Sequence, residues 1–286
     1  IRSVSRFGLS AVYIYFEENL DLYFVRRLVL ERLPDARAAI PEGLGTPSMG
    51  PITSGLGEIY QFEVRGEGQS LMDLRSILEW DIAFKLRSVP GVVEVNSYGG
   101  ELKTYEVQID PDKLVSYNIS LEAVFEALEG NNANAGGNIL ERHAERAIVR
   151  GLGLIKTTQD IESIIVKEAG GTPVFVRDVA EVRIGHAVRH GAVVLNGERE
   201  IVTGTVLMIR GGNARQVVEA VKAKVDDLQQ SHILPAGMKI LPFYDRIELV
   251  TAAIDTVRDA LIEGIVLVVF VFFFFLGHVR SAVVVT

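Results

Sequence analysis

The sequence predicts an α+β protein made of ferredoxin-like βαβ subdomains, with an inserted subdomain and a transmembrane α-helix after them. Three observations lead to this prediction. A strand, helix and proline-glycine layout occurs three times, a stretch of different character separates two of the copies, and an unbroken apolar run lies near the last residue. The chain has 286 residues, of which 48% are apolar. That is enough apolar material for more than one compact domain.

The first copy of the layout lies near the first residue. Residues 9–16 are rich in valine, tyrosine, isoleucine and phenylalanine, which favours a strand. Residues 20–40 carry apolar side chains near helical spacing, which favours an amphipathic helix. Pro41 and Gly43 then end this helix.

The other two copies follow the same order. The second has a strand at 58–64, a helix at 71–86, Pro90 with Gly91, and a returning strand at 92–98. Pairs of such right-handed units form ferredoxin-like sandwiches with helices on one face of the sheet. The third copy has a strand at 201–209, a helix at 214–228, and then Pro235 and Gly237. Any α/β protein can show this spacing, so the repeats predict the fold and no function.

Residues 102–194, between the second and third copies, have a different character. We expect a strand at 104–109, a helix at 121–129 capped by Ser120, and a glycine- and asparagine-rich loop at 131–138. Further strands are expected at 147–151, 164–167, 174–175 and 179–184. If the flanking copies belong to one sandwich, this segment is an insertion that the chain enters and leaves.

The apolar run predicts a membrane span. Residues 264–277 carry no charge, and 265–276 are all isoleucine, valine, leucine or phenylalanine. With residues 260–262 added, a helix rising about 1.5 Å per residue approaches the roughly 30 Å hydrocarbon core. Glu263 then lies near one end. The alternative is a helix buried in a large soluble core, but four consecutive phenylalanines at 272–275 would surround the whole helix with rings.

The charges around this run predict its orientation. His278 and Arg280 follow it, whereas Asp255, Asp259 and Glu263 precede it. The positive-inside rule places the basic end in the cytoplasm, so residues 1 to about 250 are expected outside the cytoplasm, which in a bacterial inner-membrane protein would be the periplasm. The chain opens without a leader sequence and stops inside a renewed apolar pattern, so we expect it to be a piece of a longer protein.

Composition excludes several classes of function. Lysine and arginine number 29 against 37 aspartate and glutamate, which gives a net charge of −8, the wrong sign for nucleic-acid binding. The chain has no cysteine, which excludes disulfides, thiolate metal sites and a cysteine nucleophile. No catalytic motif is visible either, so we expect no enzyme and no cofactor.

Candidate ligands each have a simpler interpretation. His186 and His190 are four apart, but their surroundings favour strand and turn, where such residues lie more than about 10 Å apart. His143 lies in a polar stretch and is expected to be solvated. Gly211, Gly212 and Asn213 resemble an anion cradle, but Asn213 is better interpreted as a helix cap.

The methionines complete the set of candidates. Met49, Met72, Met208 and Met238 could be soft ligands for a copper-like ion, yet each lies in an apolar stretch or a turn where methionine fills gaps. We therefore assign no catalytic, cofactor-binding, metal-binding or proton-relay residue to these 286 residues.

Several short motifs together resemble one family. The chain is similar to the heavy-metal branch of the resistance-nodulation-division (RND) inner-membrane efflux transporters over essentially its whole length. The motifs are RSVSRFGLS at 2–10, PGVVEV at 90–95, QIDPDKL at 108–114, VRDVAEVRIG at 176–185, YDRI at 244–247 and HVRSA at 278–282. The short stretch at 138–147 favours the metal branch over the drug exporters.

This resemblance implies a domain organisation. Residues 1–50 would be the end of the first porter subdomain, PN1. Residues 51–101 and 195–246 would be the two parts of the second, PN2. Residues 102–194 would be the inserted docking subdomain, DN, and 247–286 would hold transmembrane helix 2 and the start of helix 3.

The resemblance also implies a function. It indicates a homotrimer that exports metal cations by proton antiport, with a periplasmic adaptor (membrane fusion) protein and an outer-membrane channel as partners. Its proton relay and main metal-binding residues would lie outside these residues, and the metal stays open. The alternative is a membrane-anchored periplasmic binding or assembly module without transport. In either case we expect contact with membrane lipid and none with nucleic acid.

Overall fold

The computed structural model describes residues 1–17, 19–142, 145–231 and 233–276. The chain divides into two compact units, Ile1–Ile52 and Thr53–Thr286.

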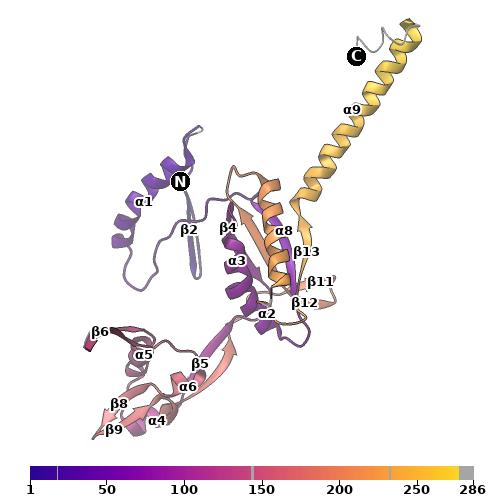
Figure 1. Ribbon diagram of the computed structural model, residues 1–286. Helices are drawn as coiled ribbons and strands as arrows, with labels where there is room; N and C mark the ends of the chain where they lie inside the picture. The colour runs from indigo at the N-terminus through magenta and orange to yellow at the C-terminus, as the bar shows by residue number, and fades with distance from the viewer. Residues whose placement is uncertain (18, 143–144, 232, 277–286) are drawn as a thin grey trace. The chain divides into compact units, whose positions relative to one another are not determined.

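The first unit is a β-hairpin followed by a helix. Strands β1 (Arg2–Arg6) and β2 (Leu9–Tyr13) pair antiparallel, and Gly8 in the turn between them has a left-handed φ of 74°. Helix α1 spans Leu22–Ala39 (Figure 1). It begins at Asp21, whose Oδ1 accepts a hydrogen bond from the Tyr23 amide at 3.0 Å, as helix caps do. The strand predicted at 9–16 thus ends at Tyr13.

The second unit is built on a five-stranded antiparallel sheet, in which four strands form the main part and the short β11 extends one of them. The strand order is β4–β12–β3–β13, and β11 pairs with the outer start of β12. Strands β3 and β4, from the second copy of the repeat, are parallel to each other with β12 between them, which is the split βαβ arrangement. The strands are β3 (Glu58–Arg65), β4 (Val92–Tyr98), β11 (Val193–Leu195), β12 (Arg199–Met208) and β13 (Lys239–Asp245).

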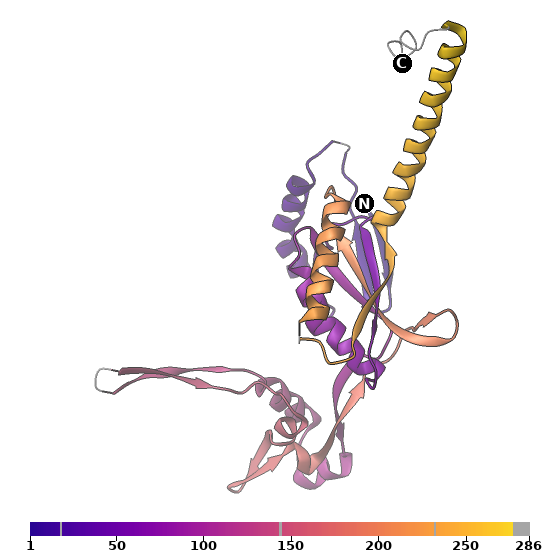
Figure 2. The ribbon, with the colours of Figure 1, turned by 45° about the vertical axis from the view of Figure 1, so that its right-hand side comes forward.

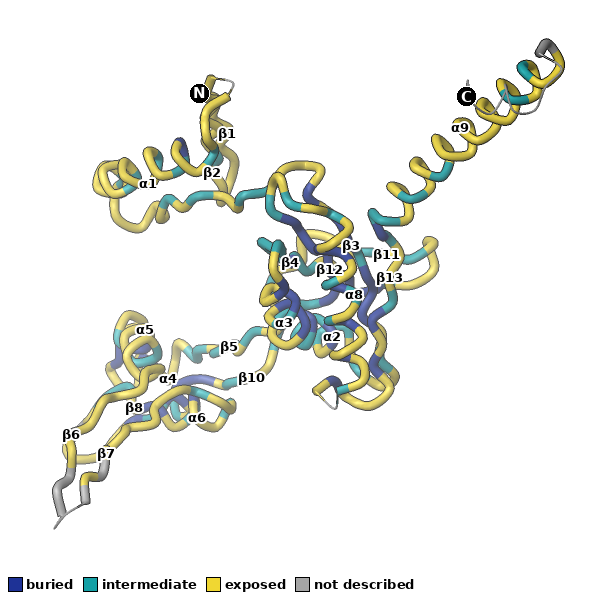
Figure 3. Tube along the Cα trace, turned by 45° about the horizontal axis from the view of Figure 1, so that its top comes forward, coloured by how far each residue is buried: buried dark blue, intermediate teal, exposed yellow. Residues whose placement is uncertain are grey.

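Helices cover one face of this sheet. The first crossover is a continuous helical stretch of α2 (Leu71–Ile77), one π-helical turn η1 (Leu78–Ile82) and α3 (Ala83–Arg87). The second crossover is α8 (Ala214–Gln230), which buries a valine stripe. Figure 3 shows the buried residues gathered where β3 and β12 meet these helices. We call the four strands with these helices the sandwich; its core includes Phe62, Leu78, Leu86, Val206, Val221 and Leu228.

The insertion predicted at 102–194 forms strands and helices outside that sheet. Strands β5 (Lys103–Ile109) and β10 (Ala180–His186) pair antiparallel, so the chain enters and leaves along one ladder. A second, small core lies under α4 and α5. The other elements are α4 (Pro111–Tyr117), α5 (Leu121–Gly130), α6 (Thr158–Glu162), β8 (Ile165–Ala169), β9 (Thr172–Phe175) and α7 (Val176–Val179).

The loop predicted at 131–138 is wrong in its second half. Strand β6 (Ala135–Arg142) already begins there and pairs with β7 (Glu145–Gly151) in a long hairpin (Figure 2). Glycines in this strand suggested a loop, but one of them is required by the pairing. A Cβ at Gly137 would lie 2.5 Å from the Val149 carbonyl oxygen, so only glycine allows this approach.

The C-terminal element is the long helix α9 (Arg246–Leu276). Its apolar half is exposed, with Leu267, Phe270 and Phe274 between 63% and 76% accessible. Within the described part of the chain, no helix is long and apolar enough to cross a membrane, so the predicted transmembrane helix is not confirmed. His278 and Arg280, which set the predicted orientation, lie outside the described residues.

Candidate functional site

The structure places several of the candidate ligands named from the sequence in different surroundings. His186 ends β10, and His190 lies beyond that strand, in a segment without regular secondary structure. Met208 and Met238 are buried in the sandwich core, where they fill space among valine and leucine side chains. Among the residues that the structure describes, no three histidine, aspartate or glutamate side chains gather as a metal site. His143 lies outside those residues.

Two predicted helix caps are confirmed. Asn213 Oδ1 accepts a hydrogen bond from the Gln216 amide at 3.2 Å, so the Gly211–Asn213 stretch starts α8. Ser120 Oγ accepts from the Ala123 amide at 3.1 Å and starts α5. In both cases the side chain satisfies an amide that would otherwise have no partner in the first helical turn.

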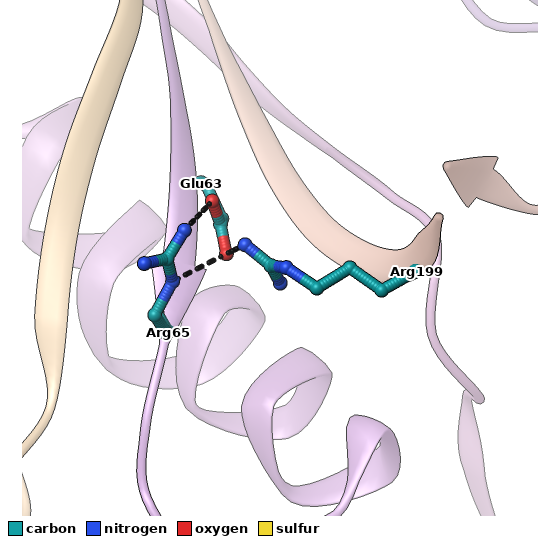
Figure 4. Close-up of polar contacts among 3 residues, drawn as sticks. All are labelled: Glu63, Arg65 and Arg199. Carbon is teal, nitrogen blue, oxygen red and sulfur yellow. Dashed lines mark hydrogen bonds and ion pairs between the residues drawn. The ribbon is translucent and has the colours of Figure 1, made fainter. Parts of the chain in front are cut away.

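The structure reveals a buried carboxylate that sequence reasoning missed, that of Glu63. It lies on β3, where Tyr60, Phe62 and Val64 point to the helix-covered core. Because side chains alternate along a strand, Glu63 points to the opposite face of the sheet. Its side chain is only 6% exposed. A buried carboxylate needs partners, and here they are two arginines (Figure 4).

The two arginines bind Glu63 from different strands. On β3, Arg65 Nε donates to Glu63 Oε1 at 3.0 Å and Nη2 donates to Oε2 at 2.9 Å, the paired geometry typical of arginine and carboxylate. Arg199, at the start of β12, donates from Nη2 to Oε1 at 2.7 Å. We call these three residues the Glu63 clamp. It fastens the start of β12 to β3.

Two buried threonines and one exposed tyrosine lie near the clamp. Thr203 is directly opposite Glu63 in the register, and Tyr98 is opposite Thr203 on the next strand. Thr203 and Thr205 are 4% and 6% exposed. The face of the sheet opposite the helices therefore carries several polar side chains, with the clamp where β3 ends and β12 begins.

The clamp fixes the charge state of Glu63. Burial by itself would raise the pKa of this carboxyl, but the hydrogen bonds from Arg65 and Arg199, helped by their positive charges, bring the pKa below its ordinary 4.5. Glu63 is therefore ionised at neutral pH. Two guanidinium groups against one carboxylate leave a net positive charge, which repels cations. The arrangement suits a mechanical brace and not a cation ligand.

A second group of charges lies where the chain passes between the sandwich and the insertion. Arg189 Nη1 lies 3.8 Å from Glu101 Oε1, and Arg189 also pairs with Glu200 at the start of β12. A cavity of about 540 Å³ adjoins them, lined in part by Arg75 and His190. Arg189 thus joins the chain entering the insertion, the chain leaving it and the sandwich.

Comparison with known proteins decides the family. All 286 residues match the AcrB/AcrD/AcrF family. The chain belongs to this family. It is 43% identical, over 99% of its length, to the cobalt-zinc-cadmium resistance protein CzcA of Cupriavidus metallidurans (strain ATCC 43123 / DSM 2839 / NBRC 102507 / CH34). It is 41% identical, over the same share, to the cation efflux system protein CusA of Escherichia coli (strain K12).

Solved structures of this family agree with the fold. A heavy metal efflux pump, in its crystal form II, superposes with a TM-score of 0.83 at 36% identity, over 94% of this chain and 27% of the pump. The chain likewise spans 27% of the length of both curated relatives. The predicted resemblance to heavy-metal RND transporters is thereby confirmed, together with a mixed α/β fold.

Proposed function

We propose that this chain is part of a proton-driven exporter of heavy-metal cations in the bacterial inner membrane. One observation carries the proposal: identity of 41–43% over 99% of the chain to proteins named for cobalt, zinc and cadmium resistance and for cation efflux. Identity of this extent retains fold and architecture. The share of the pump outside these residues supplies the proton relay and the main metal ligands in this proposal.

The proposal assigns a mechanical role to the domains. Residues 51–101 and 195–246 would act as a porter subdomain, and the insertion as a docking subdomain toward an adaptor and an outer-membrane channel in a trimer. Transporters of this kind move rigid bodies against each other around a substrate path. The sandwich suits this role because its sheet is packed on one face and braced by the Glu63 clamp on the other.

The proposal also places the second half of α9 in the lipid. Its side chains from Ile265 to Phe274 are mostly exposed in this chain, and eight of its large apolar residues exceed 40% accessibility. A contiguous exposed apolar surface of that kind needs a nonpolar partner. Hydrocarbon tails supply one around the whole circumference, which fits a helix with apolar residues on every side.

The test is transport by the full-length parent protein in proteoliposomes. With a proton gradient imposed, we expect a metal indicator to report movement of at least one of zinc, cobalt, cadmium, nickel, copper or silver ions, and no movement when an uncoupler removes the gradient. Binding without movement, for all six metals, would instead support a membrane-anchored binding or assembly module and reject the exporter.

A further inference from the structure

A second buried carboxylate lies where the sandwich ends and α9 begins. Asp245 is the last residue of β13, and its side chain is 5% exposed. Its Oδ1 accepts a hydrogen bond from the Ile247 amide at 2.8 Å, in the first turn of α9. Its Oδ2 forms an ion pair with Lys222 of α8. The Asp245 carboxylate therefore contacts both α8 and α9, which are separate in the sequence.

A β-bulge directs Asp245 toward α8. On β13, Ile240 lies opposite Val64 and Pro242 opposite Phe62, but Tyr244 lies opposite Gln61. Phe243 is thus an extra residue, and it shifts the alternation by one. Asp245 comes to lie opposite Tyr60, whose ring is in the helix-covered core. Without the bulge, strict alternation would turn the carboxylate to the other face, away from Lys222.

The surroundings of Asp245 exclude most water. Tyr60, its partner in the register, is 2% exposed. Burial, and next the negative charges of Asp245 and Asp226, raise the pKa of Tyr60 to about 12. The phenol therefore stays neutral, and Lys222 is the cation that forms an ion pair with Asp245. The carboxylate is shielded from water, whereas the Lys222 side chain is 42% exposed, so solvent screens the pair from the lysine side only.

Two further contacts hold the same turn of α9. Ile247 packs against the sandwich core, and the Arg246 guanidinium donates to the Leu56 carbonyl oxygen. Further along α9, Leu249, Ile254 and Val257 are between 55% and 61% exposed. Among the described residues, the contacts that fix α9 to the sandwich are therefore concentrated in its first turn.

We propose that Asp245, through Lys222 and the first turn of α9, is the positioning residue that makes α9 and the sandwich move as one body. The inference deepens the proposed transport function and rests on it for its meaning. A displacement of α9 in the membrane would then move the sheet by the same amount, because the connection between them does not deform. A rigid joint of this kind is what coupling between distant sites requires.

The chain offers a matched control two residues away. Lys224 also lies on α8 and pairs with Asp227 at 2.7 Å, but the Asp227 side chain is 61% exposed and both residues belong to the same helix. Exposed pairs of this kind contribute little. Lys224→Met removes a lysine charge from the same helix and leaves the Asp245 joint intact.

The experiment measures the joint directly in the full-length protein. Spin labels at the exposed positions Ala223→Cys on α8 and Ala253→Cys on α9 report the distance distribution between the helices. We expect a narrow distribution in the parent and in Lys224→Met, and a clearly broader one in Lys222→Met. Asp245→Asn should also broaden it, although asparagine still caps the helix.

A double variant separates the joint from simple destabilisation. Lys222→Met with Asp245→Asn leaves no unpaired buried charge, so a general stability defect should recover while the broad distribution persists. Return of the narrow distribution in the double variant, or unchanged distributions in both single variants, would overturn the proposal.

Transport then tests the consequence. With the metal dissociation constant and the trimer unchanged, Lys222→Met should slow proton-driven transport by roughly tenfold, and Lys224→Met should not. Full transport by Lys222→Met would overturn the positioning role. If the parent transports no metal, the exporter proposal fails, while the distance distributions still decide whether Asp245 fixes the joint.

Discussion

Removing the arginines of the Glu63 clamp should destabilise the protein more than neutralising its carboxylate. Removing both arginines, as Arg65→Met with Arg199→Met, leaves a carboxylate that is 6% exposed without a partner. Breaking a buried pair in this way costs about 3–5 kcal/mol. Glu63→Gln instead leaves two guanidinium groups that are 49% and 43% exposed and can return to water. We expect that substitution to cost about 1–2 kcal/mol.

The assay is native-state hydrogen exchange of the β3 and β12 amides in the full-length protein. Local opening free energies report these strands without requiring the whole protein to unfold in one step. At about 1.4 kcal/mol per tenfold, the double arginine variant should speed exchange roughly a hundredfold or more. Lys224→Met, which breaks a partly exposed ion pair within α8, should leave exchange of these strands unchanged.

A triple variant and a pH series complete the test of the clamp. Adding Glu63→Gln to the double arginine variant should restore much of the protection, because the buried charge is gone. The lowered pKa of Glu63 gives the pH dependence: the stabilisation is complete above pH 4.5 and disappears as pH falls through the lower folded-state pKa. Greater loss in Glu63→Gln than in the double arginine variant would refute the reasoning.

Three more predictions concern other parts of the second unit. Tyr60 has its pKa raised from 10.0 to about 12, so the stability it contributes should be complete below pH 10 and lost as pH rises through about 12, as tyrosinate absorbance compared with Tyr60→Phe would show. Gly99→Ala should destabilise more than Gly237→Ala in thermal unfolding. Both have left-handed φ angles, but only at Gly99 would a Cβ meet a carbonyl oxygen, at 2.2 Å. Arg189→Met should raise hydrogen exchange of the Ala187 amide, which donates to the Leu102 carbonyl just before β5, by a measurable factor below about tenfold, since the partners of Arg189 are partly exposed. Unchanged exchange would exclude a bracing role.

Local sequence patterns predicted much of the fold. Periodicity and the proline-glycine punctuation placed the helices that became α1 and α8, and capping chemistry at Ser120 and Asn213 was readable because it acts over three residues. Strand β1 was missed. Its sequence, RSVSR, is mostly polar and exposed, so it lacks the apolar alternation that indicates a strand.

Long-range contacts explain why the buried carboxylates were not predicted. Arg199 lies 136 residues from Glu63, and only the sheet register brings them together. The readable signal was a charged residue between Phe62 and Val64, in the part of the strand where both neighbours are apolar and buried. For Asp245 the local pattern is misleading, because the bulge at Phe243 reverses the alternation that a sequence pattern assumes.

The two carboxylates share a physical logic. Glu63 joins β3 to the start of β12, and Asp245 joins the end of β13 to α8 and α9. An apolar residue would often hold such contacts at lower cost in solvation, but it would tolerate sliding, whereas a charge pair with directed hydrogen bonds fixes one arrangement. If α9 moves with the sandwich, a flexible contact at Glu63 or at Asp245 would allow the displacement of α9 to deform the sheet locally. Loss of the Asp245 joint should therefore reduce transport most in a protein whose Glu63 clamp is intact, because a sheet already softened at the clamp transmits less of that displacement to begin with.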